Sequence, residues 1–267
     1  MRNVRPPAVA GMFYPAQAAV LRQTLDACFA QAQAGETALR PKALVAPHAG
    51  YIYSGPVAAS AYRLLEPWAD NIRRVVLLGP VHRVWVPGLA LPGADAFETP
   101  LGQVPVDHEA IRAIADLPQV TLSPAAHDQE HSLEVHLPFL QRVLGDFSLV
   151  PLAVGGAAAS AVAQVLDRLW GGAETLIVVS SDLSHYLPYH TAADQDRQTA
   201  RAILRLDDHL QGEQACGAAP LNGLLLAARQ RGLGAHLLDL RNSGDTAGDR
   251  QRVVGYGAFA FTEVGHA

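Results

Sequence analysis

One pattern constrains the fold of this chain more than any other: a short apolar run that ends in a histidine-bearing turn. In the stretch Lys42 to Gly55, the apolar residues 43–46 are followed by Pro47, His48 and a turn rich in Gly, Ser and Tyr. Such runs form strands buried on both faces, and proline cannot donate a hydrogen bond to a sheet ladder. A helical pattern follows Gly55. Strand, histidine turn and helix in this order are typical of α/β sheets, which carry their functional groups at the carboxyl ends of strands.

The pattern recurs further along the chain. Residues 73–79 (RRVVLLG) form a second buried-strand pattern that leads to His82, and residues 174–181 (ETLIVVSS) form a third. Strands at 147–154, 235–240 and 253–264 alternate with helical patterns, and no linker-like segment interrupts them. We therefore predict a single α/β domain over residues 1–267, with a mostly parallel sheet flanked by helices.

Composition excludes several classes of protein. Hydrophobic residues make up 49% of the chain, yet no apolar run is long enough to cross a membrane. The net charge is −5 and there is no basic run, so nucleic acid is not an expected partner. Cys28 and Cys216 lie far apart and form no CxxC pair, and the N-terminus lacks the apolar core of an export signal. These observations predict a cytoplasmic protein with no membrane partner.

Polar side chains follow four of the predicted strands: His48, His82, Asp182 with His185, and the stretch Ser243 to Thr246, which includes Asp245. If the strands share one sheet, their carboxyl ends meet in one crevice. Two imidazoles and a carboxylate are the ligands of non-haem Fe(II) in its facial triad, and a further histidine beside such a centre can act as a general acid or base.

Structural roles compete with these functional ones. Asp182 and Asp245 each follow a strand, where an aspartate often caps a helix or closes a turn. His136 fits a partly exposed helix histidine, whereas for His131, next to Glu130, the sequence leaves both roles open.

Three further side chains can also be explained by structural roles. Tyr51 and Tyr53 either line the pocket or pack against it. Cys216 is expected to be a small buried residue rather than a nucleophile, because no neighbouring group in the sequence lowers its pKa.

Taken in order, the motifs of the chain resemble those of the Memo family, known in microbes as AmmeMemoRadiSam system protein B. The matching motifs are APHAGYIYSG at 46–55, LLGPVHR at 77–83, EHSLEVHLPFL at 130–140, VVSSDLSHY at 178–186, CG at 216–217 with Pro220, and NSGD at 242–245. They extend over nearly the whole chain. The family is similar in fold to the class III extradiol ring-cleaving dioxygenases (the LigB-like fold).

The resemblance implies roles for individual residues. His48 and His82 match the two metal-ligand histidines, His185 matches the acid/base histidine, and Asp182 is its acidic neighbour. The animal proteins carry a cysteine near the NSGD stretch, where this chain offers Asp245 and Thr246. We expect Asp245 as the third ligand, since threonine is a poor one, and the loss of the thiolate favours Fe(II) over copper. Ala218 stands where relatives usually have arginine.

The leading functional hypothesis is thus a metal-binding protein with a non-haem iron pocket, acting as an Fe(II)-dependent dioxygenase or other oxidoreductase on a small-molecule or peptide ligand. Zinc and copper are the alternative metals, and a zinc hydrolase is a weaker alternative function. A different class of function is a non-catalytic binding module whose partner would be a radical-SAM protein, as the name of the microbial system implies.

Overall fold

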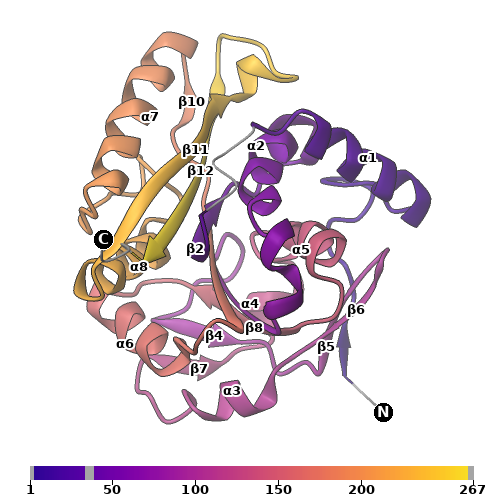
Figure 1. Ribbon diagram of the computed structural model, residues 1–267, viewed down its shortest axis with the longest axis vertical. Helices are drawn as coiled ribbons and strands as arrows, with labels where there is room; N and C mark the ends of the chain where they lie inside the picture. The colour runs from indigo at the N-terminus through magenta and orange to yellow at the C-terminus, as the bar shows by residue number, and fades with distance from the viewer. Residues whose placement is uncertain (1–2, 34–38, 264–267) are drawn as a thin grey trace.

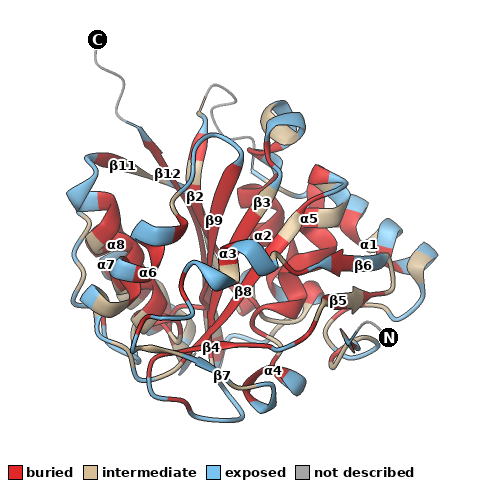
Figure 2. Ribbon diagram, turned by 90° about the horizontal axis from the view of Figure 1, so that it is seen from below, coloured by how far each residue is buried: buried red, intermediate tan, exposed pale blue. Residues whose placement is uncertain are grey.

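A parallel four-stranded core organises the molecule. The computed structural model describes residues 3–33 and 39–263. Its central strands are β2 (Pro41–Ala46), β9 (Thr175–Ser180), β3 (Arg74–Pro80) and β8 (Ser148–Val154), which lie side by side in that order and run parallel. Their residues are almost all buried, as apolar runs without alternation predict (Figure 2).

Antiparallel strands extend the sheet on both sides. Next to β2 lies β12 (Val253–Glu263), which also pairs with β11 (Leu233–Asn242) and β10 (His185–Leu187). On the other side, β4 (Leu89–Leu91) pairs with β8 and with β7 (Val120–Leu122). The predicted parallel sheet is therefore confirmed for its centre, and the whole sheet is mixed. The end of the predicted last strand, Val264, lies outside the described residues.

Helices cover both faces of the sheet (Figure 1). One face packs against α1 (Ala18–Ala30), α2 (Tyr51–Arg63) and α5 (Leu137–Leu144). The other packs against α6 (Ala159–Leu169), α7 (Tyr189–Leu204) and α8 (Ala218–Gln230). Each face thus has its own apolar core, as expected for strands that are apolar on both sides.

A small second sheet holds the N-terminal segment. It consists of β1 (Val4–Arg5), β5 (Ala96–Thr99) and β6 (Gly102–Pro105), and β5 and β6 form an antiparallel hairpin. The remaining short elements are α3 (His108–Arg112), capped by Asp107, α4 (Ala125–Asp128), and the 3₁₀ turns at Glu66–Asn71, Glu134–His136 and Ser243–Asp245.

Helix α2 differs from the sequence-based expectation because it begins at Tyr51, before Gly55, and contains Pro56. The N-terminal segment explains the early start, since the backbone N–H of Tyr51 donates to the carbonyl of Phe13 and so satisfies one of the free donors of the first turn. In the part of the chain that the structure describes, no helix is long and apolar enough to span a membrane.

Candidate metal centre

A pocket opens at the carboxyl ends of β2, β3 and β9, where the sequence predicts a crevice. Its cavity volume is about 800 Å³. The turns that follow these strands contribute His48, His82 and Asp182, and β10 contributes His185. Segments far apart in the chain complete the wall; the remaining lining residues are Phe13, Ala49, Gly50, Tyr53, His131, Tyr186, Ser243, Ala247, Gly248, Asp249, Arg252, Val254 and Tyr256.

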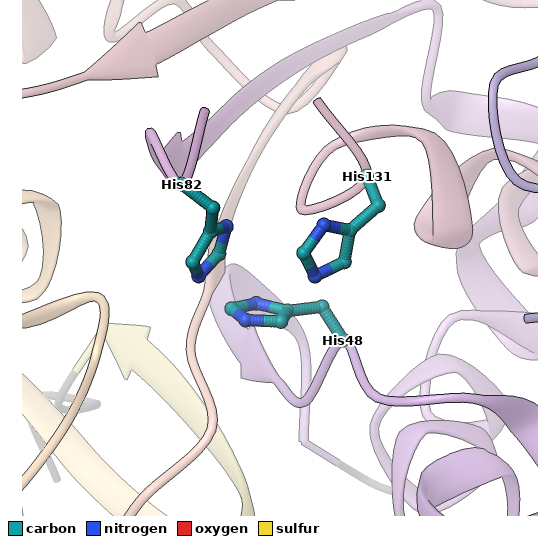
Figure 3. Close-up of side chains that lie close together, drawn as sticks. All are labelled: His48, His82 and His131. Carbon is teal, nitrogen blue, oxygen red and sulfur yellow. The ribbon is translucent and has the colours of Figure 1, made fainter. Parts of the chain in front are cut away.

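Three imidazoles converge in this pocket: His48, His82 and His131 (Figure 3). One ring nitrogen from each lies within 4.8 Å of the others. The ring centroids of His48 and His82 are 5.1 Å apart, and those of His82 and His131 are 4.6 Å apart. His48 is buried, whereas His82 and His131 keep part of their rings open to the pocket. Three imidazoles in this arrangement could hold a metal ion and leave one side of it accessible.

Hydrogen bonds fix the orientation of the His48 ring. Ser180 donates its hydroxyl proton to the carbonyl of Ser132 at 2.6 Å, so its oxygen accepts from Nδ1–H of His48, also at 2.6 Å. The proton therefore resides on Nδ1, and the lone pair of Nε2 is free to bind a metal. A histidine that binds a metal through one ring nitrogen usually donates a hydrogen bond from the other in this way.

Glu130 does the same for His82. Its carboxylate accepts from Nδ1–H of His82 at 2.8 Å and from the backbone N–H of Ser132 at 2.9 Å, and its Oε1 lies 3.4 Å from Nδ1 of His131. Burial by itself would raise the pKa of Glu130, but these hydrogen bonds outweigh it and lower the pKa to about 2. A carboxylate that stays ionised behind His82 leaves Nε2 of that ring as the free nitrogen.

Two of the imidazoles, those of His131 and His48, are held in the neutral form that metal binding requires. Burial lowers the pKa of His131 to about 4, with a further contribution from the nearby His82. Burial, together with the neighbouring histidines, also lowers the pKa of His48 well below its ordinary value. At neutral pH, protons therefore compete little with a cation for these two rings.

Asp182, His185 and Cys216 lie beside the cluster. The Oδ1 atom of Asp182 accepts from the backbone N–H of His48 at 2.8 Å, and burial raises the pKa of Asp182 to about 7. Burial lowers the pKa of His185, which lines the same pocket. The half-buried thiol of Cys216 lies 3.3 Å from Nε2 of His48, and burial raises its pKa to about 12. This contact could not be predicted from the sequence, because Cys216 directly precedes α8 and is remote from His48 in the chain.

Asp245 is not part of the cluster, which corrects the ligand set expected from the sequence. Its Oδ2 accepts from the backbone N–H of Asn242 at 3.0 Å in the capping box of a 3₁₀ turn, and its Oδ1 accepts from the hydroxyl of Tyr189 at 2.6 Å. It lines a separate, smaller cavity. Asp245 therefore has the structural role that competed with metal binding in the sequence analysis: it caps the turn that follows a strand. In the described residues, the third group beside His48 and His82 is His131.

The other predicted pocket residues divide into two groups. Tyr53 and Ser243 line the pocket, whereas the hydroxyl of Tyr51 donates to the carbonyl of Val135 in the core. Thr246 donates to the carbonyl of Ser243 and does not line the pocket. His136, expected to be partly exposed, is buried and bonded to the hydroxyl of Tyr62 at 2.7 Å.

The fold and the site together define a class: an α/β protein whose sheet presents a histidine cluster in an open pocket at its carboxyl edge. The chain belongs to the Memo family, whose sequence model, described as "Memo-like protein", matches residues 5–260. A MEMO1 family protein of Methanothermobacter thermautotrophicus is 37% identical, over 95% of this chain and 98% of the relative. A MEMO1 family protein of Ignicoccus hospitalis is 38% identical, over 97% of this chain and 98% of the relative.

A solved structure supports the fold. An uncharacterized protein of Escherichia coli K12 superposes with a TM-score of 0.51 at 15% sequence identity, over 80% of this chain and 98% of that chain. A similarity at this level of identity concerns the fold alone. With the family match, it confirms the predicted fold class, an α/β sheet flanked by helices of the LigB-like type.

Proposed function

We propose that this protein binds a divalent transition metal through His48, His82 and His131 and acts as a metal-dependent oxidoreductase on a small molecule held in the pocket. The observation that carries the proposal is the convergence of three imidazoles, two of which have Nδ1 engaged by hydrogen bonds. Imidazole nitrogens suit iron, copper, zinc and nickel, whereas calcium and magnesium prefer oxygen ligands.

Fe(II) is the first metal to test, with zinc and copper as alternatives. A carboxylate ligand would have favoured iron, but Asp245 is committed to its capping turn, and three imidazoles accept all three metals. A bound metal of this kind supplies Lewis acidity and, for iron or copper, redox chemistry.

The protein's own groups would manage protons around the substrate. His185 lines the pocket, and burial lowers its pKa, so its ring is neutral at pH 7 and can accept a proton from a bound hydroxyl group. Asp182 holds the backbone at His48 and, with a pKa of about 7, can exchange a proton in the same range. Deep burial of His48 and Asp182 keeps bulk water from that side of the pocket.

The test is the metal content of anaerobically purified protein, measured by elemental analysis for the wild type and for His48→Ala, His131→Ala and Asp245→Ala. We expect near-stoichiometric metal in the wild type, loss in both histidine variants, and retention in Asp245→Ala, which serves as the matched control. A wild type that stays metal-free when offered Fe(II), Zn(II) and Cu would refute the proposal. Equal loss in Asp245→Ala would refute the ligand assignment.

Catalysis is tested separately from binding. His185→Ala should retain metal but lose oxygen consumption with any substrate that the wild type turns over. If oxygen has no effect on turnover, the zinc hydrolase becomes the better description.

A binding module is the second candidate, favoured by exposed apolar side chains beside the pocket-lining segments. Met12 and Ile52, which are 73% and 65% exposed, directly precede the lining residues Phe13 and Tyr53, and Trp85, which is 70% exposed, lies three residues after His82. Where such side chains form one patch, they mark an interaction surface. The first partner to test is a radical-SAM protein. Co-purification that survives His185→Ala but is lost in Trp85→Ser would favour this function.

A further inference from the structure

The rim of the metal pocket carries a charged group that the proposed function does not use. Arg252, directly before β12, is the one lysine or arginine among the described residues that line the pocket. Asp249, which also lines it, accepts from the backbone N–H groups of Gln251 and Arg252 at 2.8 and 3.3 Å. Its carboxylate therefore shapes the turn before β12. Among residues 3–33 and 39–263, the guanidinium of Arg252 has no ion pair and no hydrogen bond.

An aromatic ring holds this guanidinium in place. The Cζ atom of Arg252 lies 5.1 Å from the centroid of the Tyr186 ring. Stacking on an aromatic face orients an arginine while leaving its N–H edge free to bind a planar, two-oxygen anion.

The backbone at Tyr186 is unusual in a way that supports a functional role. Tyr186 has a φ of +59°, in the left-handed region, and its side chain is 62% exposed although it directly follows His185. A non-glycine residue in the left-handed region is strained, and such residues cluster at functional sites. This conformation keeps a large ring at the pocket mouth rather than in the core.

The pocket walls match a flat, unsaturated body. The aromatic lining residues are Phe13, Tyr53, Tyr186 and Tyr256. Aromatic walls with a few convergent polar groups are typical of sites for planar small molecules. The carboxylates in the lining, Asp182 and Asp249, would repel a doubly charged phosphate more than a singly charged group.

From this arrangement we infer that the pocket selects small aromatic carboxylates, whose carboxylate binds Arg252 at the rim while the ring lies against the aromatic walls. This inference rests on the proposed function for the reaction that follows binding, but not for the binding itself. A bidentate pair between guanidinium and carboxylate supplies both affinity and orientation, and it would direct the opposite end of the ligand toward the histidine cluster.

The test uses metal-free protein, so that a carboxylate cannot bind a metal instead. Dissociation constants of benzoate and of its uncharged analogue benzamide are measured by ligand-observed NMR titration. We expect benzoate to bind at least about tenfold more tightly than benzamide. Arg252→Gln should remove that difference while leaving the dissociation constant of benzamide unchanged. Arg250→Gln is the matched control. The Cζ atom of Arg250 lies 4.5 Å from the centroid of the Tyr189 ring, and Arg250 does not line the pocket. Its replacement should change the dissociation constant of neither ligand.

Other outcomes overturn the inference. Equal binding of benzoate and benzamide to the wild type would do so, as would unchanged benzoate binding in Arg252→Gln or tighter binding of phenyl phosphate than of benzoate. If Arg252→Gln folds poorly, Arg252→Lys takes its place in the test. It retains the charge but not the planar guanidinium, so it should weaken the binding of benzoate only in part.

Metal content of the same preparations separates this inference from the proposed function. Carboxylate selectivity in a protein that binds no metal refutes the function alone. Metal binding without carboxylate selectivity refutes the inference alone.

Discussion

A buried ion pair outside the pocket lining offers the sharpest test of how the site is held. Glu134 and Arg5 are almost fully buried, and Nη1 of Arg5 lies 2.5 Å from Oε2 of Glu134. The same carboxylate accepts from the backbone N–H groups of Ala8 and Val9 at 2.7 and 3.0 Å and from the hydroxyl of Tyr14 at 2.6 Å. One side chain thus anchors the whole N-terminal segment to the loop that precedes α5.

Glu134→Gln keeps the shape of this side chain but removes its charge and one acceptor oxygen. The amide NH₂ must then face donors that the carboxylate satisfied, and Arg5 loses its buried counterion. Removing one partner of a buried pair costs about 3–5 kcal/mol, and we expect a free energy of unfolding lower by roughly that amount at pH 7. Urea unfolding of the metal-free protein measures it, with a shift of the midpoint and little change of slope.

Asp26→Asn is the control, because it is also a carboxylate-to-amide change in an ion pair, with Arg142, but both side chains are largely exposed. Such pairs contribute about 0–1 kcal/mol. If Glu134→Gln costs no more than Asp26→Asn, the carboxylate is not the anchor that its contacts indicate.

The same variant should also weaken the metal site. Arg5 donates to the carbonyls of His127 and Glu130 at 2.9 and 2.6 Å, so it fixes the loop that carries Glu130 and His131. We expect lower metal affinity in Glu134→Gln even where the variant is fully folded. Unchanged affinity would show that this loop holds its shape without Arg5 and Glu134.

Three further predictions concern stability, measured by urea unfolding of metal-free protein. Burial raises the folded-state pKa of Asp182 from 3.8 to about 7, so the wild type loses stability as the pH rises between these values. The free energy of unfolding of Asp182→Asn should therefore rise by roughly 2–4 kcal/mol relative to that of the wild type between pH 4 and pH 8. A difference between the two proteins that does not change with pH would contradict this prediction. Burial lowers the folded-state pKa of His127 to about 4, so stability is lost as the pH falls from 6.5 to 4, and His127→Gln should flatten that fall by up to about 3 kcal/mol. A Cβ added at Gly223 would lie 2.3 Å from the side chain of Val162, so Gly223→Ala should cost about 1–3 kcal/mol by forcing α6 and α8 apart, and a neutral change would mean that this contact relaxes freely.

The sequence predicted the parts of the site that depend on strand order. His48, His82 and Asp182 follow β2, β3 and β9, and these strands are neighbours in the parallel core, so their ends meet. Buried strands read as apolar runs, which made both the sheet and this edge predictable. Even the turn after β11 lies at the expected edge, since Ser243 lines the pocket.

Side-chain direction and long-range partners could not be predicted in the same way. Asp245 lies only two residues after Ser243, but its carboxylate turns to Asn242 and Tyr189, a choice made by local capping geometry. His131 reaches the cluster from a loop rather than a strand end. Its one signal in the sequence was the adjacent Glu130, whose bond to His82 appears only when residues 48 positions apart meet.

The origin of the pocket walls has a consequence for how the protein is made. The three clustered histidines and β9, which separates β2 from β3, are all made by residue 180, whereas Tyr256 belongs to β12 and Arg252 directly precedes it. During synthesis, the histidine cluster can therefore form before the wall opposite it. Until the last strand inserts between β2 and β10, the cluster would lie at an open surface, and only the arrival of that strand would give the pocket its second wall.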